Sequence, residues 1–128
     1  MPRARRKEVE ASAGSPGNPI PLPKSKKLLQ RYYAGGRLPS PMGGRLEVLG
    51  VREGQQGRGR VMLECSTSSL RFILEVPRAS RDEREEVAET LAAGNDPTCP
   101  RHGSSQALAK QGKRYVCPRC GVTYARLD

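Results

Sequence analysis

The feature that most constrains this chain is a pentapeptide that occurs twice near its C-terminus with one residue exchanged. Its two copies are Cys99-Pro100-Arg101-His102-Gly103 and Cys117-Pro118-Arg119-Cys120-Gly121. Proline after the first ligand sets a turn, and glycine after the second permits a positive φ, so both ligand side chains of a turn can point at one ion. Residues 103 to 116 separate the two turns and suit a hairpin that brings them together.

The two turns predict one metal site, formed by Cys99, His102, Cys117 and Cys120. Three thiolates and one imidazole make a closed tetrahedral shell of the kind that holds a single structural Zn²⁺. An iron centre or a redox pair is the alternative for paired cysteines, but the repeated turn favours zinc. A closed shell leaves no position for a reactive water, and the chain has no second histidine to act as a general base, so we expect no enzymatic activity.

Residues 97–128 resemble the zinc-ribbon superfamily, which is found in transcription, translation and replication proteins. The resemblance rests on the two ligand turns, a turn at residues 110–113, and candidate strands at 114–116 and 122–127. It covers about a quarter of the chain and departs from the usual pattern at His102, where the family more often has cysteine. The resemblance implies a structural metal and, frequently, a surface that docks on nucleic acid or protein.

The sequence predicts a small α+β protein in three parts, two of which precede the ribbon. Residues 1–43, rich in proline, glycine and basic side chains, are expected to form a disordered arm that either stays flexible or orders on a partner. Residues 26–33 of this arm can form a short helical turn, because Leu28, Leu29, Tyr32 and Tyr33 fall on neighbouring faces. Residues 44–95 are expected to form a three-stranded antiparallel meander, since apolar and polar residues alternate there, followed by one helix that starts at a Ser80–Glu83 capping box. Cys65 falls on an apolar strand face and is predicted to be a buried thiol.

Positive charge is concentrated at the two ends of the chain. Of a net charge of +10, residues 1–45 contribute ten basic against two acidic residues and residues 99–128 contribute six against one, whereas residues 46–98 have seven against ten. Such an excess favours a polyanionic partner, although it can also serve solubility alone. The candidate nucleic-acid contacts are Arg3, Arg5, Arg6, Lys7, Lys24, Lys26, Lys27, Arg31, Arg101, Lys110, Lys113, Arg114, Tyr115, Arg119 and Arg126.

Two functions fit these features. The first is a non-enzymatic, zinc-binding nucleic-acid-binding protein of ribosomal, phage or transcription-accessory type, with RNA and DNA both open. The second is a structural or adaptor protein that docks on protein partners in a large assembly, such as a virus particle or a polymerase complex. Neither requires a small-molecule substrate. No apolar run is long enough to span a membrane, and paired cysteines without a secretory signal indicate the cytoplasm or another reducing compartment, the host cytoplasm if the protein is phage-encoded.

Overall fold

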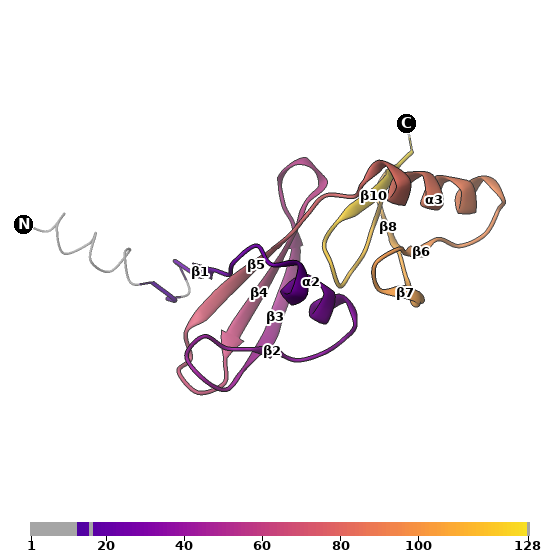
Figure 1. Cartoon of the computed structure of the whole chain (residues 1–128). Helices are drawn as coiled ribbons and strands as arrows, with labels where there is room; N and C mark the ends of the chain where they lie inside the picture. The colour runs from indigo at the N-terminus through magenta and orange to yellow at the C-terminus, as the bar shows by residue number, and fades with distance from the viewer. Residues whose placement is uncertain (1–12, 16, 128) are drawn as a thin grey trace, which may run out of the picture.

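The computed structural model describes residues 13–15 and 17–127, which form a small α+β protein (Figure 1). Its largest sheet has the strand order β1-β5-β4-β3-β2. The strands are β1 (Ile20–Pro21), β2 (Leu38–Pro39), β3 (Arg45–Glu53), β4 (Gly59–Cys65) and β5 (Arg71–Val76). Strand β1 runs parallel to β5, and the other neighbours are antiparallel.

The alternation of apolar residues explains why β4 lies at the centre of this sheet. Val61, Leu63 and Cys65 are buried on one face, while the residues between them are more exposed. Because side chains of a strand point alternately to opposite faces, one face of β4 supplies the core. Strands β3, β4 and β5 follow one another in the chain, and a short 3₁₀ turn (Gln55–Gly57) joins β3 to β4.

The segment before β3 differs from the predicted disordered arm. In its described part, β1, helix α2 (Lys26–Tyr33) and β2 are formed, and Ser25 caps α2 by accepting a hydrogen bond from the Leu28 amide at 3.3 Å. An isolated helix of this length is marginal in water, so tertiary packing must stabilise it. Tyr32 provides that packing, because it is buried in the common core. The described chain therefore has two α-helices: α2, where the sequence allowed a short helical turn, and a second one at residues 81–92, where it predicted a helix.

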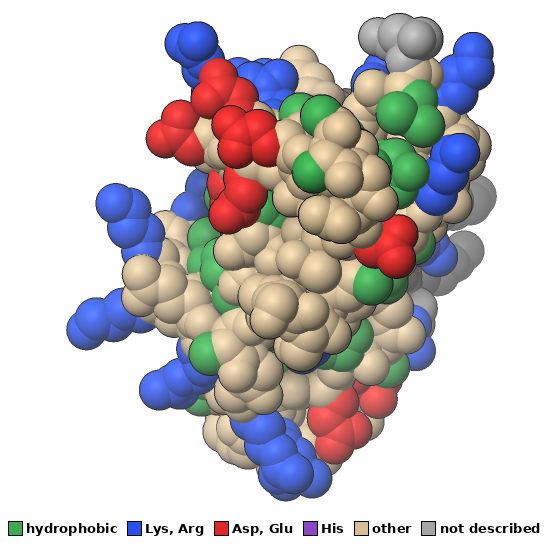
Figure 2. Space-filling view, turned by 90° about the vertical axis from the view of Figure 1, so that its right-hand side faces the viewer, with side chains coloured by type: hydrophobic (Ala, Val, Ile, Leu, Met, Phe, Trp, Pro, Cys, Tyr) green, Lys and Arg blue, Asp and Glu red, His purple; other side chains and the backbone are tan. Residues whose placement is uncertain are grey.

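Helix α3 (Arg81–Ala92) begins at the predicted capping box. The Ser80 side chain accepts from the Glu83 amide at 3.2 Å, and the Glu83 carboxylate accepts from the Ser80 amide at 2.8 Å. Asp82 and Glu83 occupy the first turn, where the helix dipole favours negative charge. Val87 is the residue that α3 buries, and α3 packs against the last strand of the chain. Figure 2 shows a group of acidic side chains at the upper left and further ones towards the right-hand side, with Lys and Arg projecting around the edges of the molecule.

The C-terminal part contains five short strands in two sheets. Strands β6 and β7 pair antiparallel, and β8, β9 and β10 form a three-stranded antiparallel sheet with β9 in the middle. The strands are β6 (Thr98–Cys99), β7 (Gly103–Ala107), β8 (Ala109–Gln111), β9 (Arg114–Val116) and β10 (Thr123–Arg126). The described chain contains no helix that is long and apolar enough to cross a membrane.

The C-terminal sheets dock on the β3–β4 end of the large sheet. Gly59 approaches so closely that a Cβ atom there would lie 1.7 Å from the Cys120 carbonyl oxygen. Glu53, at the end of β3, forms an ion pair with Arg114 at 2.6 Å and accepts a hydrogen bond from the Thr123 hydroxyl at 3.3 Å. Buried residues of both parts belong to one continuous hydrophobic core. The two parts that the sequence divided at residues 95–97 therefore pack as neighbours.

Candidate metal centre

The two pentapeptide turns bring the four predicted ligands together. The ligand atoms of Cys99, His102, Cys117 and Cys120 all lie within 4.8 Å of one another, and the three cysteines are buried. The His102 ring presents Nδ1 to the sulfurs, at 3.6 Å from Cys99, 3.7 Å from Cys117 and 3.0 Å from Cys120. The four atoms thus converge on one point, where they could hold a single metal ion.

The three sulfurs are electrostatically coupled. Hydrogen bonds from Cys117 and Cys120 hold the pKa of Cys99 well below its ordinary value, while contact with the Cys117 and Cys99 sulfurs raises the pKa of Cys120. Neighbouring thiols therefore cannot all become thiolates by themselves, because each negative charge opposes the next. A bound cation removes that opposition by favouring the thiolate form of every ligand. The donor set is thus suited to a cation.

Two tyrosines of helix α2 cover the histidine ligand. The Tyr32 and Tyr33 rings stand edge-to-face against the His102 ring, with centroid distances of 5.6 and 5.7 Å. The Tyr32 hydroxyl also donates a hydrogen bond to the Arg119 carbonyl oxygen in the second turn. His102 Nε2 is buried and has no hydrogen-bond partner among the described residues, so the surrounding rings, not a polar group, fix the imidazole. Burial raises the pKa of Tyr33 to about 12, so this ring stays neutral at physiological pH.

Arg101, in the first turn, points inward to the helix and loop beside it. Its guanidinium donates to the two Glu83 carboxylate oxygens at 2.8 and 3.0 Å and to the Tyr33 hydroxyl at 3.1 Å. It also donates to the carbonyl oxygens of Pro77 at 2.7 Å and Arg78 at 2.8 Å. Only 10% of its side chain is exposed. Arg101 therefore links the first ligand turn to α3, and its N–H groups are engaged in hydrogen bonds within the protein.

The remaining predicted nucleic-acid contacts fall into three groups. Arg3, Arg5, Arg6 and Lys7 lie outside the described residues. Arg114 is paired with Glu53, and Tyr115 is half-buried against the core. The exposed members are Lys24, Lys26, Lys27, Arg31, Lys110, Lys113, Arg119 and Arg126. They lie on several elements, so the structure leaves a dispersed set of exposed basic side chains on both parts of the molecule.

Sequence reasoning missed three residues that support the site, namely Tyr32, Tyr33 and Glu83. Tyr32 and Tyr33 carried a signal, since with Leu28 and Leu29 they form an apolar side of a short helix, but nothing indicated the surface on which it packs. Glu83 was identified as a capping residue, and its second role depends on a contact between residues 18 positions apart. These supports arise from tertiary structure.

Cys65 lies away from the metal ligands and is buried, as its strand position predicted. Ser40 donates to its sulfur at 2.9 Å, and the Thr67 hydroxyl lies 3.3 Å from it. Hydrogen bonds from Ser40, Ser68 and Thr67 lower the pKa of Cys65 to about 6. The sulfur thus links β4 to the loop before β3 and does not join the metal centre.

Comparison with known proteins gives one informative match. The chain is 42% identical over 48 residues to the small ribosomal subunit protein eS31 of Methanopyrus kandleri, a match that spans 38% of this chain and 77% of that protein. No family model matches the chain. No solved structure matches it either. The match covers most of the relative and a minority of this chain. On the strength of this matched segment, the chain belongs to the family of the small ribosomal subunit protein eS31.

Proposed function

We propose that this protein is a non-enzymatic, zinc-binding protein of ribosomal type, in which one structural Zn²⁺ shapes a basic surface that contacts RNA. The observation that carries the proposal is the convergence of Cys99, His102, Cys117 and Cys120. The family relationship supports the ribosomal setting, because the matched relative is a small ribosomal subunit protein. The reducing cytoplasm, which keeps thiols free to bind metal, is the compartment that this function requires.

The distances between the ligand atoms support zinc as the metal. Tetrahedral bonds of typical zinc length place two sulfurs about 3.8 Å apart and a sulfur about 3.6 Å from a ligating nitrogen. The Cys99–Cys120 sulfur distance is 3.8 Å, and His102 Nδ1 lies 3.6 Å from the Cys99 sulfur and 3.7 Å from the Cys117 sulfur, while its 3.0 Å distance to the Cys120 sulfur is shorter than this geometry gives. When bound, the ion would hold the two turns together, and it would supply no reactive position because all four ligands come from the chain.

A second candidate, docking on a protein partner within an assembly, is favoured by one observation. Val48 and Leu49 on β3 are 51% and 47% exposed, beyond the point where the two-residue β2 covers the strand edge. Exposed apolar side chains next to an uncovered strand edge are typical of a protein-binding surface. A ribosomal protein can make both kinds of contact, so this candidate differs from the first in whether RNA is needed.

Co-sedimentation of the tagged full chain with ribosomes from its native host tests the proposal. We expect the protein in the small-subunit fraction at low salt, with release as salt is raised or after nuclease digestion, because phosphate contacts are salt-dependent. Cys117→Ser, which removes a metal ligand, is expected to leave that fraction, whereas the matched Cys65→Ser is expected to remain in it. A protein that stays in the soluble fraction at low salt would refute the ribosomal role. Retention after complete RNA digestion would favour protein docking.

A further inference from the structure

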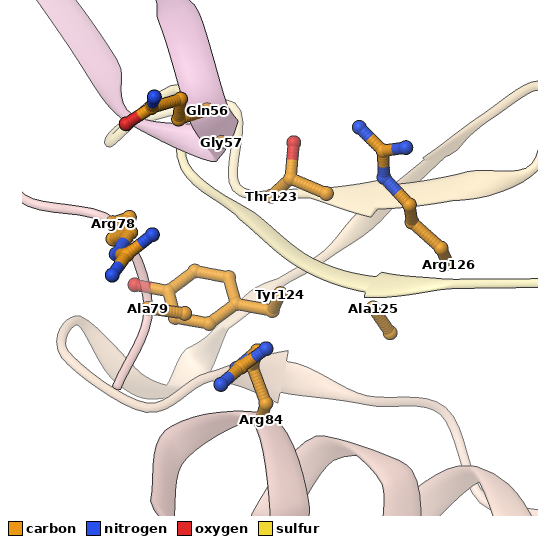
Figure 3. A pocket seen from close by; sticks show the side chains of 9 residues that line it. All are labelled: Gln56, Gly57, Arg78, Ala79, Arg84, Thr123, Tyr124, Ala125 and Arg126. Atoms are coloured by element: carbon orange, nitrogen blue, oxygen red, sulfur yellow. The ribbon is translucent and has the colours of Figure 1, made fainter. Parts of the chain in front are cut away.

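A hollow lined by three arginines lies where the large sheet, α3 and the C-terminal sheet meet (Figure 3). Its volume is about 470 Å³. The three arginines come from three elements: Arg78 from the β5–α3 loop, Arg84 from α3 and Arg126 from β10. Figure 3 shows Arg78 and Arg84 on two sides of the Tyr124 ring, with Arg126 further along the last strand. The fold thus gathers positive charge that is widely separated in the sequence.

The positive charge of this hollow is not balanced by the described carboxylates. Six other arginines form ion pairs with Glu side chains, at distances from 2.6 to 3.9 Å. Among the described residues, neither Arg78, Arg84 nor Arg126 forms such a pair, and the nearby Glu83 is already bound by Arg101. Three guanidinium groups around one hollow repel one another, and a bound anion would relieve that repulsion.

Two further hollows with basic lining residues lie near the first. Arg78 also lines a hollow of about 220 Å³ together with Lys24 and Arg58. Arg58 in turn lines one of about 240 Å³ with Arg60. Glu75 lines both of these hollows and pairs with Arg60 at 3.9 Å, so the surplus positive charge comes from the other basic residues. Arg78 thus lies between the first hollow and the second, and Arg58 between the second and the third. We name the basic residues that line the three hollows the arginine track. It consists of Lys24, Arg58, Arg60, Arg78, Arg84 and Arg126.

The chemistry of the arginine track matches a chain of phosphates. Guanidinium groups recognise phosphate oxygens with two parallel hydrogen bonds, and they remain charged at all physiological pH values. A single small anion would occupy one hollow, whereas a row of hollows fits anions that repeat along a strand. Tyr124, the aromatic residue of the first hollow, is only 1% exposed, so no aromatic face is offered there for stacking with a base. Contact would therefore be with the backbone and carry little sequence preference.

We propose that the arginine track binds the phosphate backbone of an RNA strand, with the three-arginine hollow as its principal contact. The proposal rests on the RNA contact proposed above and assigns it to a site. Four of the six residues, Arg58, Arg60, Arg78 and Arg84, lie in the acidic middle region, and only folding brings them together with Lys24 and Arg126 from the two basic ends.

Fluorescence anisotropy with a labelled single-stranded RNA oligomer tests this assignment on the zinc-loaded full chain. The test variant combines Arg78→Gln, Arg84→Gln and Arg126→Gln, all at exposed positions. The control variant combines Arg37→Gln, Arg45→Gln and Arg52→Gln, which remove the same formal charge at exposed positions that line none of the three hollows. Zinc content and circular dichroism verify that both variants are folded.

We expect the test variant to bind RNA about 10- to 100-fold more weakly than the wild type and the control variant to lose much less. Because each phosphate contact on a single strand contributes about 0.7 to the slope of log affinity against log salt, the loss of three contacts makes that slope shallower by about 2. Homopolymeric RNAs of different bases should bind with similar affinity, since backbone contacts do not read sequence.

The outcomes separate this proposal from the function on which it rests. If the wild type binds RNA and both triple variants lose affinity equally, RNA contact stands but the arginine track is wrong. If the wild type has no affinity for RNA at low salt, the RNA contact itself is refuted, and the track with it. Competition distinguishes the source of the anion. Displacement of the RNA by polyglutamate or by inorganic phosphate at equal charge concentration would overturn the assignment to a nucleic-acid strand.

Discussion

Replacing Arg101 with methionine should destabilise the protein far more than the loss of an ordinary surface ion pair. The side chains of Arg101 and Glu83 are 10% and 23% exposed, and the guanidinium also serves the Tyr33 hydroxyl and the carbonyl oxygens of Pro77 and Arg78. Breaking a buried pair by removing one partner costs about 3 to 5 kcal/mol, because the remaining charge and acceptors lose their donors. We expect a loss of that size in the free energy of unfolding.

Arg81→Met is the matched control. Arg81 pairs with Glu85 at 3.0 Å, a distance close to that of the Arg101 pair, but the two side chains are 84% and 57% exposed. Exposed pairs on a helix contribute about 0.3 to 0.5 kcal/mol, since water screens them. The two variants therefore differ mainly in burial, and a difference of several kcal/mol between them measures what burial adds.

Urea denaturation at a fixed free zinc concentration is the assay, because a metal that binds only the folded state shifts the apparent stability. Glu83→Gln completes a double-mutant cycle with Arg101→Met while keeping a capping residue at this position. Hydrogen bonds from Arg101 and Ser80 outweigh the effect of burial and hold the pKa of Glu83 below its ordinary value. The stabilisation is therefore complete above that value and is lost as the pH falls through the lower folded pKa. An Arg101→Met loss equal to that of Arg81→Met would refute the reasoning.

Two further variants test other contacts. Gly59→Ala should destabilise the protein by about 3 kcal/mol or more and release metal, because its Cβ atom would meet the Cys120 carbonyl oxygen. Gly50→Ala is the control, since a Cβ atom there meets no atom within 4 Å. Equal thermal unfolding temperatures of the two variants would show that the C-terminal part does not pack tightly on the large sheet. Ser40→Ala should raise the pKa of Cys65 from about 6 towards its ordinary value, as measured by ultraviolet absorbance of the thiolate in zinc-loaded protein. Because the pKa of Cys65 is lower in the folded than in the unfolded chain, the thiolate stabilises the wild type at high pH, and this contribution is lost as the pH falls through about 6. An unchanged titration of Cys65 in Ser40→Ala would contradict the role of Ser40.

The convergence of the four candidate metal ligands could be predicted from sequence because ligand spacing is a local property. Residues three positions apart in a Pro- and Gly-containing turn converge whatever surrounds them. The strands around Val61 and Phe72 could be located for the same reason, since an alternation of period two reports directly on a half-buried strand. The capping box of α3 is likewise confined to four consecutive residues.

What could not be predicted depends on packing between distant residues. Arg101 and Arg119 occupy the same position in the repeated pentapeptide, yet Arg101 is clamped by Glu83 while Arg119 is exposed. Nothing in either turn distinguishes them. In the described part of the predicted disordered arm, α2 is formed for a related reason, because it is stabilised by placing Tyr32 over the ligand turns, and that surface exists only in the folded chain. The arginine track could not be predicted from the distribution of charge along the sequence, because its residues come from separate regions of the chain.

Metal analysis of the full chain tests the central claim most directly. Native mass spectrometry of protein purified without chelators should find one zinc ion per chain, held by Cys99, His102, Cys117 and Cys120. Chelation should then unfold the C-terminal part, because a structural zinc site contributes folding free energy. A full-length chain that stays folded with no zinc, or that carries its thiols as a disulfide, would contradict the account.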